Sequence, residues 1–102
     1  MFIAMNRFKV APGKEAQFEE QWRNRTSHLG GVPGFVRFAL LRGDQRGDYV
    51  SHTTWASRDA FIAWTQSEAF AAGHRQGSVM GVLEGPPQLS TYEAVIEEQR
   101  EG

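Results

Sequence analysis

The sequence predicts an α+β fold in which helices cover one face of an antiparallel sheet. Several short segments have apolar residues at every second position, which is typical of strands. The segments between them have apolar residues three or four positions apart, which is typical of helices. Glycine, proline and aspartate separate the two kinds of segment, as expected at turns.

Length, charge and composition narrow the class of protein. The chain has 102 residues, and we expect residues 1–102 to form one small domain. A formal net charge of -1 gives no reason to expect nucleic acid as a partner. The absence of cysteine excludes disulfides, thiolate metal sites and cysteine nucleophiles. No apolar run approaches the roughly 18 residues of a membrane span, and no signal-peptide pattern is visible, so we expect a cytoplasmic protein without a membrane partner.

The first expected strand covers residues 2–10. Its even-numbered positions share one face, and they are Phe2, Ala4, Asn6, Phe8 and Val10. Asn6 is therefore a polar side chain on a face that we expect to be buried. A buried amide without a partner costs about 1–3 kcal/mol. Asn6 either bonds a neighbouring backbone group or serves a ligand.

A helix is expected from Lys14 to about Leu29. One stripe of this helix holds Phe18, Trp22, Arg25 and Leu29, at spacings of four, three and four. An arginine is unexpected on a stripe that only packs a core. Arg25 could pair with a ligand carboxylate, because a guanidinium matches a carboxylate with two hydrogen bonds. The ordinary alternative is a solvated arginine.

Three further strands are expected. Residues 35–41 and 49–55 form a hairpin around the glycine- and aspartate-rich segment 42–48, and residues 88–96 form the last strand. The second strand has apolar residues on both faces, with Phe35, Ala39 and Leu41 on one and Val36, Phe38 and Leu40 on the other. Helices can cover only one face of the sheet. We therefore expect a homodimer with the two sheets face to face.

Two helices are expected between the hairpin and the last strand. Ser57 is a plausible N-cap for a helix through about Trp64, and Ser67 for a helix from Glu68 to about His74. The order is then strand, helix, strand, strand, helix pair, strand. This order predicts a ferredoxin-like α+β arrangement.

His74 is the strongest candidate for a metal ligand, because a neutral imidazole binds iron well. Phe70 lies one helical turn before it and would keep the site dry. The ordinary alternative is a surface histidine favoured by the dipole at a helix C-terminus. His28 and His52 are rival candidates. A histidine, an asparagine and a tryptophan among apolar residues suggest a pocket for a large flat ligand, and heme is the first candidate.

Phe61 and Trp64 are three residues apart and share a helix face. Together they could press on the face of a porphyrin. The alternative is that both are ordinary core residues, which pattern alone favours.

These residues resemble the Asn/Trp/His signature of IsdG-type heme-degrading monooxygenases, within the antibiotic-biosynthesis-monooxygenase superfamily. The matching residues are Asn6, Trp64, and His74 following Phe70. Further similarity lies in Met5-Asn6-Arg7, Pro33-Gly34-Phe35 and Trp55-Ala56-Ser57. The resemblance covers nearly the whole chain.

The resemblance implies a dimeric α+β barrel with one heme pocket per subunit. It implies that His74 is the axial ligand of the iron, that Asn6 hydrogen-bonds the ligand on the other side of the iron, and that Trp64 packs against the heme. It also implies that Trp22, Arg25, Phe61 and Phe70 contact the heme. Heme would be both cofactor and substrate. Dioxygen would be the second substrate, and electrons would come from a partner reductase or a small reductant.

Two alternatives remain open at this point. A cofactor-free monooxygenase of the same superfamily would oxidise a phenol or quinol and would not bind heme. A heme chaperone or store would bind heme through the same residues but would not degrade it.

Overall fold

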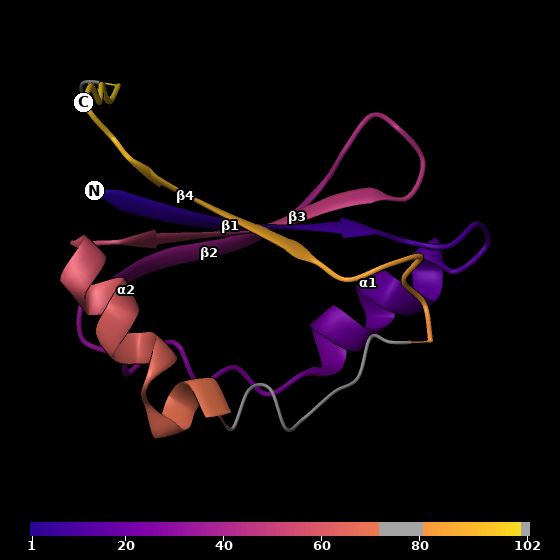
Figure 1. Cartoon of the computed structure of the whole chain (residues 1–102), viewed down its shortest axis with the longest axis horizontal. Helices are drawn as coiled ribbons and strands as arrows, with labels where there is room; N and C mark the ends of the chain where they lie inside the picture. Colours follow the sequence, from indigo (N-terminus) through magenta and orange to yellow (C-terminus); the bar gives the residue numbers. More distant parts are fainter. Residues whose placement is uncertain (72–80, 101–102) are drawn as a thin grey trace.

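The computed structural model describes residues 1–71 and 81–100 of the chain. Four strands form one antiparallel sheet in the order β2-β3-β1-β4. They are β1 (Phe2–Lys9), β2 (Phe35–Arg42), β3 (Asp48–Trp55) and β4 (Gln88–Glu93). The helices α1 (Glu15–Asn24) and α2 (Arg58–Thr65) lie on the same side of the sheet, near opposite ends (Figure 1). This arrangement confirms the predicted ferredoxin-like α+β fold.

The alternation in β1 explains how the sheet acquires a buried face. Phe2, Ala4 and Phe8 are each 5% exposed, whereas Arg7 and Lys9 between and beyond them are exposed. These buried residues point toward the helices, as the sequence predicts. Asn6 lies on the same face but is only partly buried.

The core consists of two clusters, one beneath each helix. The cluster under α1 contains Phe8, Val10, Phe18, Tyr49 and Val82. The cluster under α2 contains Phe2, Ala4, Trp55 and Phe61. The helices therefore leave the middle of the sheet uncovered by their own packing.

Helix α1 is shorter than the sequence predicts, because it ends at Asn24 and not near Leu29. Arg25 has an extended backbone with ψ 151°. Two residues later, the hydroxyl of Ser27 accepts a hydrogen bond from the backbone N–H of Leu29 at 3.4 Å. Such local bonds offer the backbone an alternative to the helix. The prediction that Arg25 and Leu29 continue the helical stripe was wrong.

The caps of the later helices are confirmed. The hydroxyl of Ser57 accepts from the N–H of Ala60 at 3.1 Å, and that of Ser67 accepts from the N–H of Phe70 at 3.2 Å. Helix α2 ends one residue after the predicted end, at Thr65. Residues 68–71 are helical, and the rest of the second predicted helix lies outside the described residues.

Strand β2 contains an irregularity that the sequence did not reveal. Its register with β3 shifts between Phe35 and Arg37. As a result Phe35 packs on the core cluster under α2 while Phe38 stacks on Trp22 of α1, so both rings lie on the helix side. The prediction that Phe35 and Phe38 lie on opposite faces was wrong.

The other face of the sheet has no cover within the described chain. Leu41 and Tyr92 on this face are 45% and 53% exposed.

Strand β4 ends at Glu93, three residues before the predicted end at Ile96. No helix in residues 1–71 or 81–100 has the length and apolar character to cross a membrane.

Candidate active site

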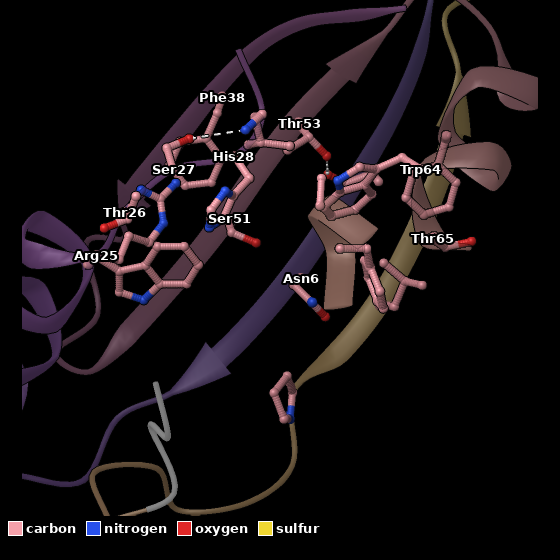
Figure 2. A pocket seen from close by; sticks show the side chains of 18 of the residues that line it. Asn6, Arg25, Thr26, Ser27, His28, Phe38, Ser51, Thr53, Trp64 and Thr65 are labelled. Carbon is pink, nitrogen blue, oxygen red and sulfur yellow. Dashed lines mark hydrogen bonds between the residues drawn. The ribbon is translucent and has the colours of Figure 1, made fainter. Parts of the chain in front are cut away.

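A cavity of about 750 Å³ lies on the helix side of the sheet, and its volume is within the usual range for small-molecule sites. All four strands and both helices contribute side chains to it, together with residues 25–29. Figure 2 shows Arg25, Thr26 and Ser27 on one side of this cavity and Trp64 on the other, with Asn6 between them. The cavity thus occupies the middle of the sheet that the two core clusters leave open.

The floor of the cavity contains three polar side chains on neighbouring strands. Asn6 of β1 and Ser51 of β3 are directly paired, and both line the cavity. The adjacent Thr53 is already satisfied, because its hydroxyl donates to the backbone oxygen of Ala4 at 3.2 Å. The Asn6 amide makes no hydrogen bond to the described part of the chain. It is therefore available to a molecule in the cavity.

Aromatic rings form the wall near α2. The ring of Phe70 meets Trp64 edge-on, with centroids 4.8 Å apart and an interplanar angle of 88°. Trp64 in turn packs on Trp55, which is fully buried, at 5.1 Å. Phe61 lies 6.1 Å from Trp64 and also lines the cavity. The wall is apolar and is held by the core behind it.

The opposite wall combines aromatic rings with a positive charge. Trp22 and Phe38 are stacked, with centroids 5.6 Å apart and 20° between the ring planes. The guanidinium carbon of Arg25 lies 5.0 Å from the Trp22 ring and 4.7 Å from the Phe38 ring. Contacts of this kind hold a cation over the faces of aromatic rings.

Arg25 is charged and has no carboxylate partner among the described residues. Burial lowers the pKa of Arg25, but arginine remains protonated at neutral pH in proteins. The nearby carboxylates of α1 are paired elsewhere: Glu19 with Arg42 and Arg23, and Glu20 with Arg23. No carboxylate in residues 1–71 or 81–100 forms an ion pair with Arg25. An anionic group of a bound molecule would be its partner.

Two buried indole N–H groups also border this cavity. Trp22 and Trp64 line it, and the Nε1 atom of each has no hydrogen-bond acceptor among residues 1–71 and 81–100. A buried donor without a partner costs about 1–3 kcal/mol. Both atoms are inaccessible to solvent, so they lie within the cavity walls and do not face the space that a ligand would fill.

The three histidines have different places. His28 lines the cavity, and Figure 2 shows it between Ser27 and Ser51. His52 pairs with Met5 and Ala39 in the sheet and lies on the face away from the helices. His74 lies outside the described residues, so its role as an iron ligand stays a prediction. The described residues contain no cluster of three or more histidine, cysteine or acidic side chains suited to a metal ion.

The structure brings together six of the seven candidate residues. The cavity is lined by Asn6, Trp22, Arg25, Phe61, Trp64 and Phe70. Sequence reasoning missed Phe38 and Ser51 as cavity residues. Ser51 had a usable signal, because it alternates with Tyr49 and Trp55 on the helix side of β3. Phe38 had no reliable signal in the sequence, because the register shift in β2 changes which face its side chain occupies relative to Phe35.

Comparison with known proteins places the chain in a family. Residues 1–76 match the model of the family described as antibiotic biosynthesis monooxygenase. The mycobilin-producing heme oxygenase of Mycobacterium tuberculosis is 35% identical over 82 residues, covering 76% of each chain. The deoxynogalonate monooxygenase of Streptomyces nogalater is 40% identical over 58 residues, covering 56% of this chain and 48% of that one.

Solved structures give the same grouping. The heme-degrader MhuD from Mycobacterium tuberculosis, with two hemes bound in its active site, has a TM-score of 0.79 at 28% identity, covering 97% of this chain and all of that one. SnoaB, a cofactor-independent oxygenase from Streptomyces nogalater, has a TM-score of 0.71 at 26% identity, covering 94% of each chain. The chain therefore belongs to the antibiotic biosynthesis monooxygenase family.

Proposed function

We propose that this chain is a heme-degrading monooxygenase, which binds heme in the cavity and opens its porphyrin ring with dioxygen and external electrons. The observation that carries the proposal is the placement of the free Asn6 amide between an aromatic wall and an arginine that has no carboxylate partner in the described chain. The similarity to a heme oxygenase over 76% of the chain supports it.

The shape and chemistry of the cavity fit heme. The porphyrin is flat and apolar, and the rings of Trp64 and Phe70 offer apolar surface for it. Its two carboxylates need a cation or hydrogen-bond donors, which Arg25 supplies at the other wall. The long dimension of heme would then run from the Trp64 wall to the Arg25 wall, over the floor that contains Asn6.

The chain's own residues contribute binding, orientation and hydrogen bonding. Heme supplies the iron at which dioxygen is activated, and His74 is the proposed ligand of that iron. The amide N–H of Asn6 would donate a hydrogen bond to oxygen on the cavity floor. Trp64 would press on the macrocycle and, with Phe70, exclude water from it. A partner reductase or a small reductant would supply the electrons.

We also propose that the protein is a homodimer. Leu41 and Tyr92 leave apolar surface on the sheet face away from the helices, and a second sheet would cover it. The site described above is built by residues of one subunit, so the proposal for heme does not depend on the dimer.

A second candidate function is a cofactor-free monooxygenase that oxidises an aromatic substrate such as a phenol. The similarity to SnoaB and to the deoxynogalonate monooxygenase favours it. In that case Asn6 would contact dioxygen or substrate directly, and no heme would bind. A heme chaperone, which would bind heme without degrading it, is the remaining alternative.

Titration of the protein with hemin, followed by the Soret absorption band, tests the binding step. We expect saturable binding with the spectrum of a histidine-ligated heme, and loss of that spectrum in His74→Ala. His52→Gln is the matched control, because His52 lies on the opposite face of the sheet. Absence of saturable binding in the unaltered protein would reject the heme proposal and favour the cofactor-free monooxygenase.

A further inference from the structure

Glu19 on α1 is the most heavily bonded carboxylate in the described chain. It accepts two hydrogen bonds from Arg42 of β2, at 2.8 and 2.9 Å, and one from the hydroxyl of Tyr49 of β3 at 2.5 Å. Arg23 adds a further bond at 3.2 Å from within the helix. The bonds from Arg42 and Tyr49 hold the pKa of Glu19 at about 2, so it is ionised at neutral pH. Glu19 thus ties α1 to two strands at once.

This cluster lies directly behind the Arg25 wall of the cavity. A second, smaller hollow is lined by Glu19, Arg42 and Tyr49, and also by Trp22 and Phe38. Trp22 and Phe38 line the main cavity as well. The stacked pair of rings is therefore a partition, with the ligand cavity on one side and the Glu19 cluster on the other.

The two partners of the Glu19–Arg42 pair lie near the two stacked rings along the chain. Trp22 lies three residues after Glu19 on α1, and Phe38 lies four residues before Arg42 on β2. The Glu19–Arg42 pair therefore joins α1 to β2 at a point about one helical turn from Trp22 along α1 and four strand residues from Phe38 along β2. Because Trp22 belongs to α1 and Phe38 to β2, a change in the separation of the two elements would shift one ring relative to the other.

Arg25 depends on the same stack. It is the first residue after α1, and its guanidinium rests over the Trp22 and Phe38 rings. We propose that Glu19 is a positioning residue, which acts through the Trp22–Phe38 stack to hold the Arg25 guanidinium where it meets the carboxylates of the ligand. This inference rests on the proposed function, because it assumes that heme is the ligand.

A second clamp on the same helix provides a matched control. Glu15, in the first turn of α1, bonds Arg46 of the β2–β3 hairpin at 2.5 Å. It also ties α1 to the sheet, but Glu15 and Arg46 line neither hollow. If Glu19 only stabilised the helix, removal of either carboxylate would have a similar effect on ligand binding.

The test is a double-mutant cycle on hemin affinity, with Glu19→Gln, Arg25→Gln and the combined variant, beside Glu15→Gln. Residues that act as one unit show non-additive effects. We expect Glu19→Gln to weaken hemin binding about three- to tenfold when Arg25 is present. In the Arg25→Gln background, the same substitution should weaken binding by less than twofold. We expect Glu15→Gln to change the affinity by less than twofold.

Hemin dimethyl ester, in which both carboxylates are esterified, separates a positioning role from a purely structural one. A purely structural role of Glu19 would affect the affinities for hemin and for the ester equally. We expect Glu19→Gln to leave the affinity for the ester unchanged while it lowers the affinity for hemin. Tyr49→Phe removes one donor to Glu19 and keeps the carboxylate, and it should give a smaller loss in the same direction, even if Glu19→Gln folds poorly.

Three results would overturn the inference while hemin still binds: equal losses in Glu19→Gln and Glu15→Gln, additive losses in the double variant, or equal losses for hemin and its ester. Where Glu19→Gln does not fold, an unchanged hemin affinity in Tyr49→Phe would overturn it as well. Failure of the unaltered protein to bind hemin at all would reject the proposed function and the inference together.

Discussion

Asn6 of β1 lies directly opposite Ser51 of β3, and both side chains line the floor of the cavity. The pairing follows from the antiparallel register, in which directly opposed residues point to the same face. Ala4 and Phe8, on either side of Asn6 along that face, are both buried. The floor therefore presents the Asn6 amide and the Ser51 hydroxyl side by side, where both can hydrogen-bond a molecule in the cavity.

Replacement of Asn6 by alanine is expected to separate binding from turnover. The apolar walls and Arg25 remain, so hemin affinity should change by less than about threefold. A hydrogen bond to a group that becomes charged during the reaction contributes about 1.5–3 kcal/mol, so the rate of heme loss under ascorbate should fall about 10- to 100-fold. Stopped-flow spectroscopy of the Soret band measures the rate. An unchanged rate would remove Asn6 from the catalytic step.

Replacement of Arg25 by glutamine is expected to weaken binding. Its guanidinium has no carboxylate partner in the described chain and lies at the cavity wall. Loss of one charge-assisted pair should lower hemin affinity about 10-fold, with a weaker dependence on salt. Arg46→Gln is the control, because Arg46 lies outside the cavity and pairs with Glu15. Equal losses in the two variants would show that net charge, and not the Arg25 site, determines affinity.

Gly34 is expected to be intolerant of a side chain. Its φ is +83°, and an added Cβ would lie 2.4 Å from the Cβ of Ala60 on α2. Gly34→Ala therefore combines backbone strain with a steric clash, and it should lower the melting temperature by at least about 4–8 °C, the shift for 1 kcal/mol in a domain of this size.

Gly13→Ala is the matched comparison for Gly34→Ala. Gly13 has the same φ of +83°, but nothing lies within 4 Å of the added Cβ. The difference between the two melting temperatures isolates the clash with Ala60. Equal melting temperatures would mean that α2 shifts away without cost.

Acid should reduce the contribution of Glu19 to stability. Arg42 and Tyr49 lower the pKa of Glu19 from 4.5 to about 2 in the folded chain. The unfolded chain then takes up a proton at higher pH than the folded one, so the stabilisation is complete above about pH 4.5 and is lost as the pH falls toward 2. Urea unfolding of the unaltered protein and Glu19→Gln should show a gap in unfolding free energy that narrows over this window. A constant gap would contradict the assignment.

Local features were predictable from the sequence. The position of Asn6 among buried residues follows from the period of two in a strand, and the Ser57 cap follows from a single side-chain bond. For Trp64 the pattern predicted only a helix face shared with Phe61, and pattern alone favoured core positions for both. The family resemblance added the expectation that these residues share one site, and the cavity does contain Asn6 and Trp64 together.

Features that depend on tertiary contacts were not predictable. The end of α1 at Asn24 places Arg25 over two aromatic rings, and one of these rings, Phe38, comes from a strand whose register shifts. The Glu19–Arg42 pair joins residues 23 positions apart. No periodic pattern reports a bulge or a long-range ion pair, so the cationic wall of the cavity appears only in the folded structure.

The most direct test of heme degradation is aerobic turnover of the hemin complex with ascorbate, in the unaltered protein and in His74→Ala. The product is analysed by mass spectrometry, and released iron is trapped with a ferrous chelator. We expect loss of the Soret band, an oxygenated open-chain tetrapyrrole and about one iron per heme, all dependent on His74. A Soret band that persists, with no iron released by either ascorbate or an enzymatic reductant, would contradict it.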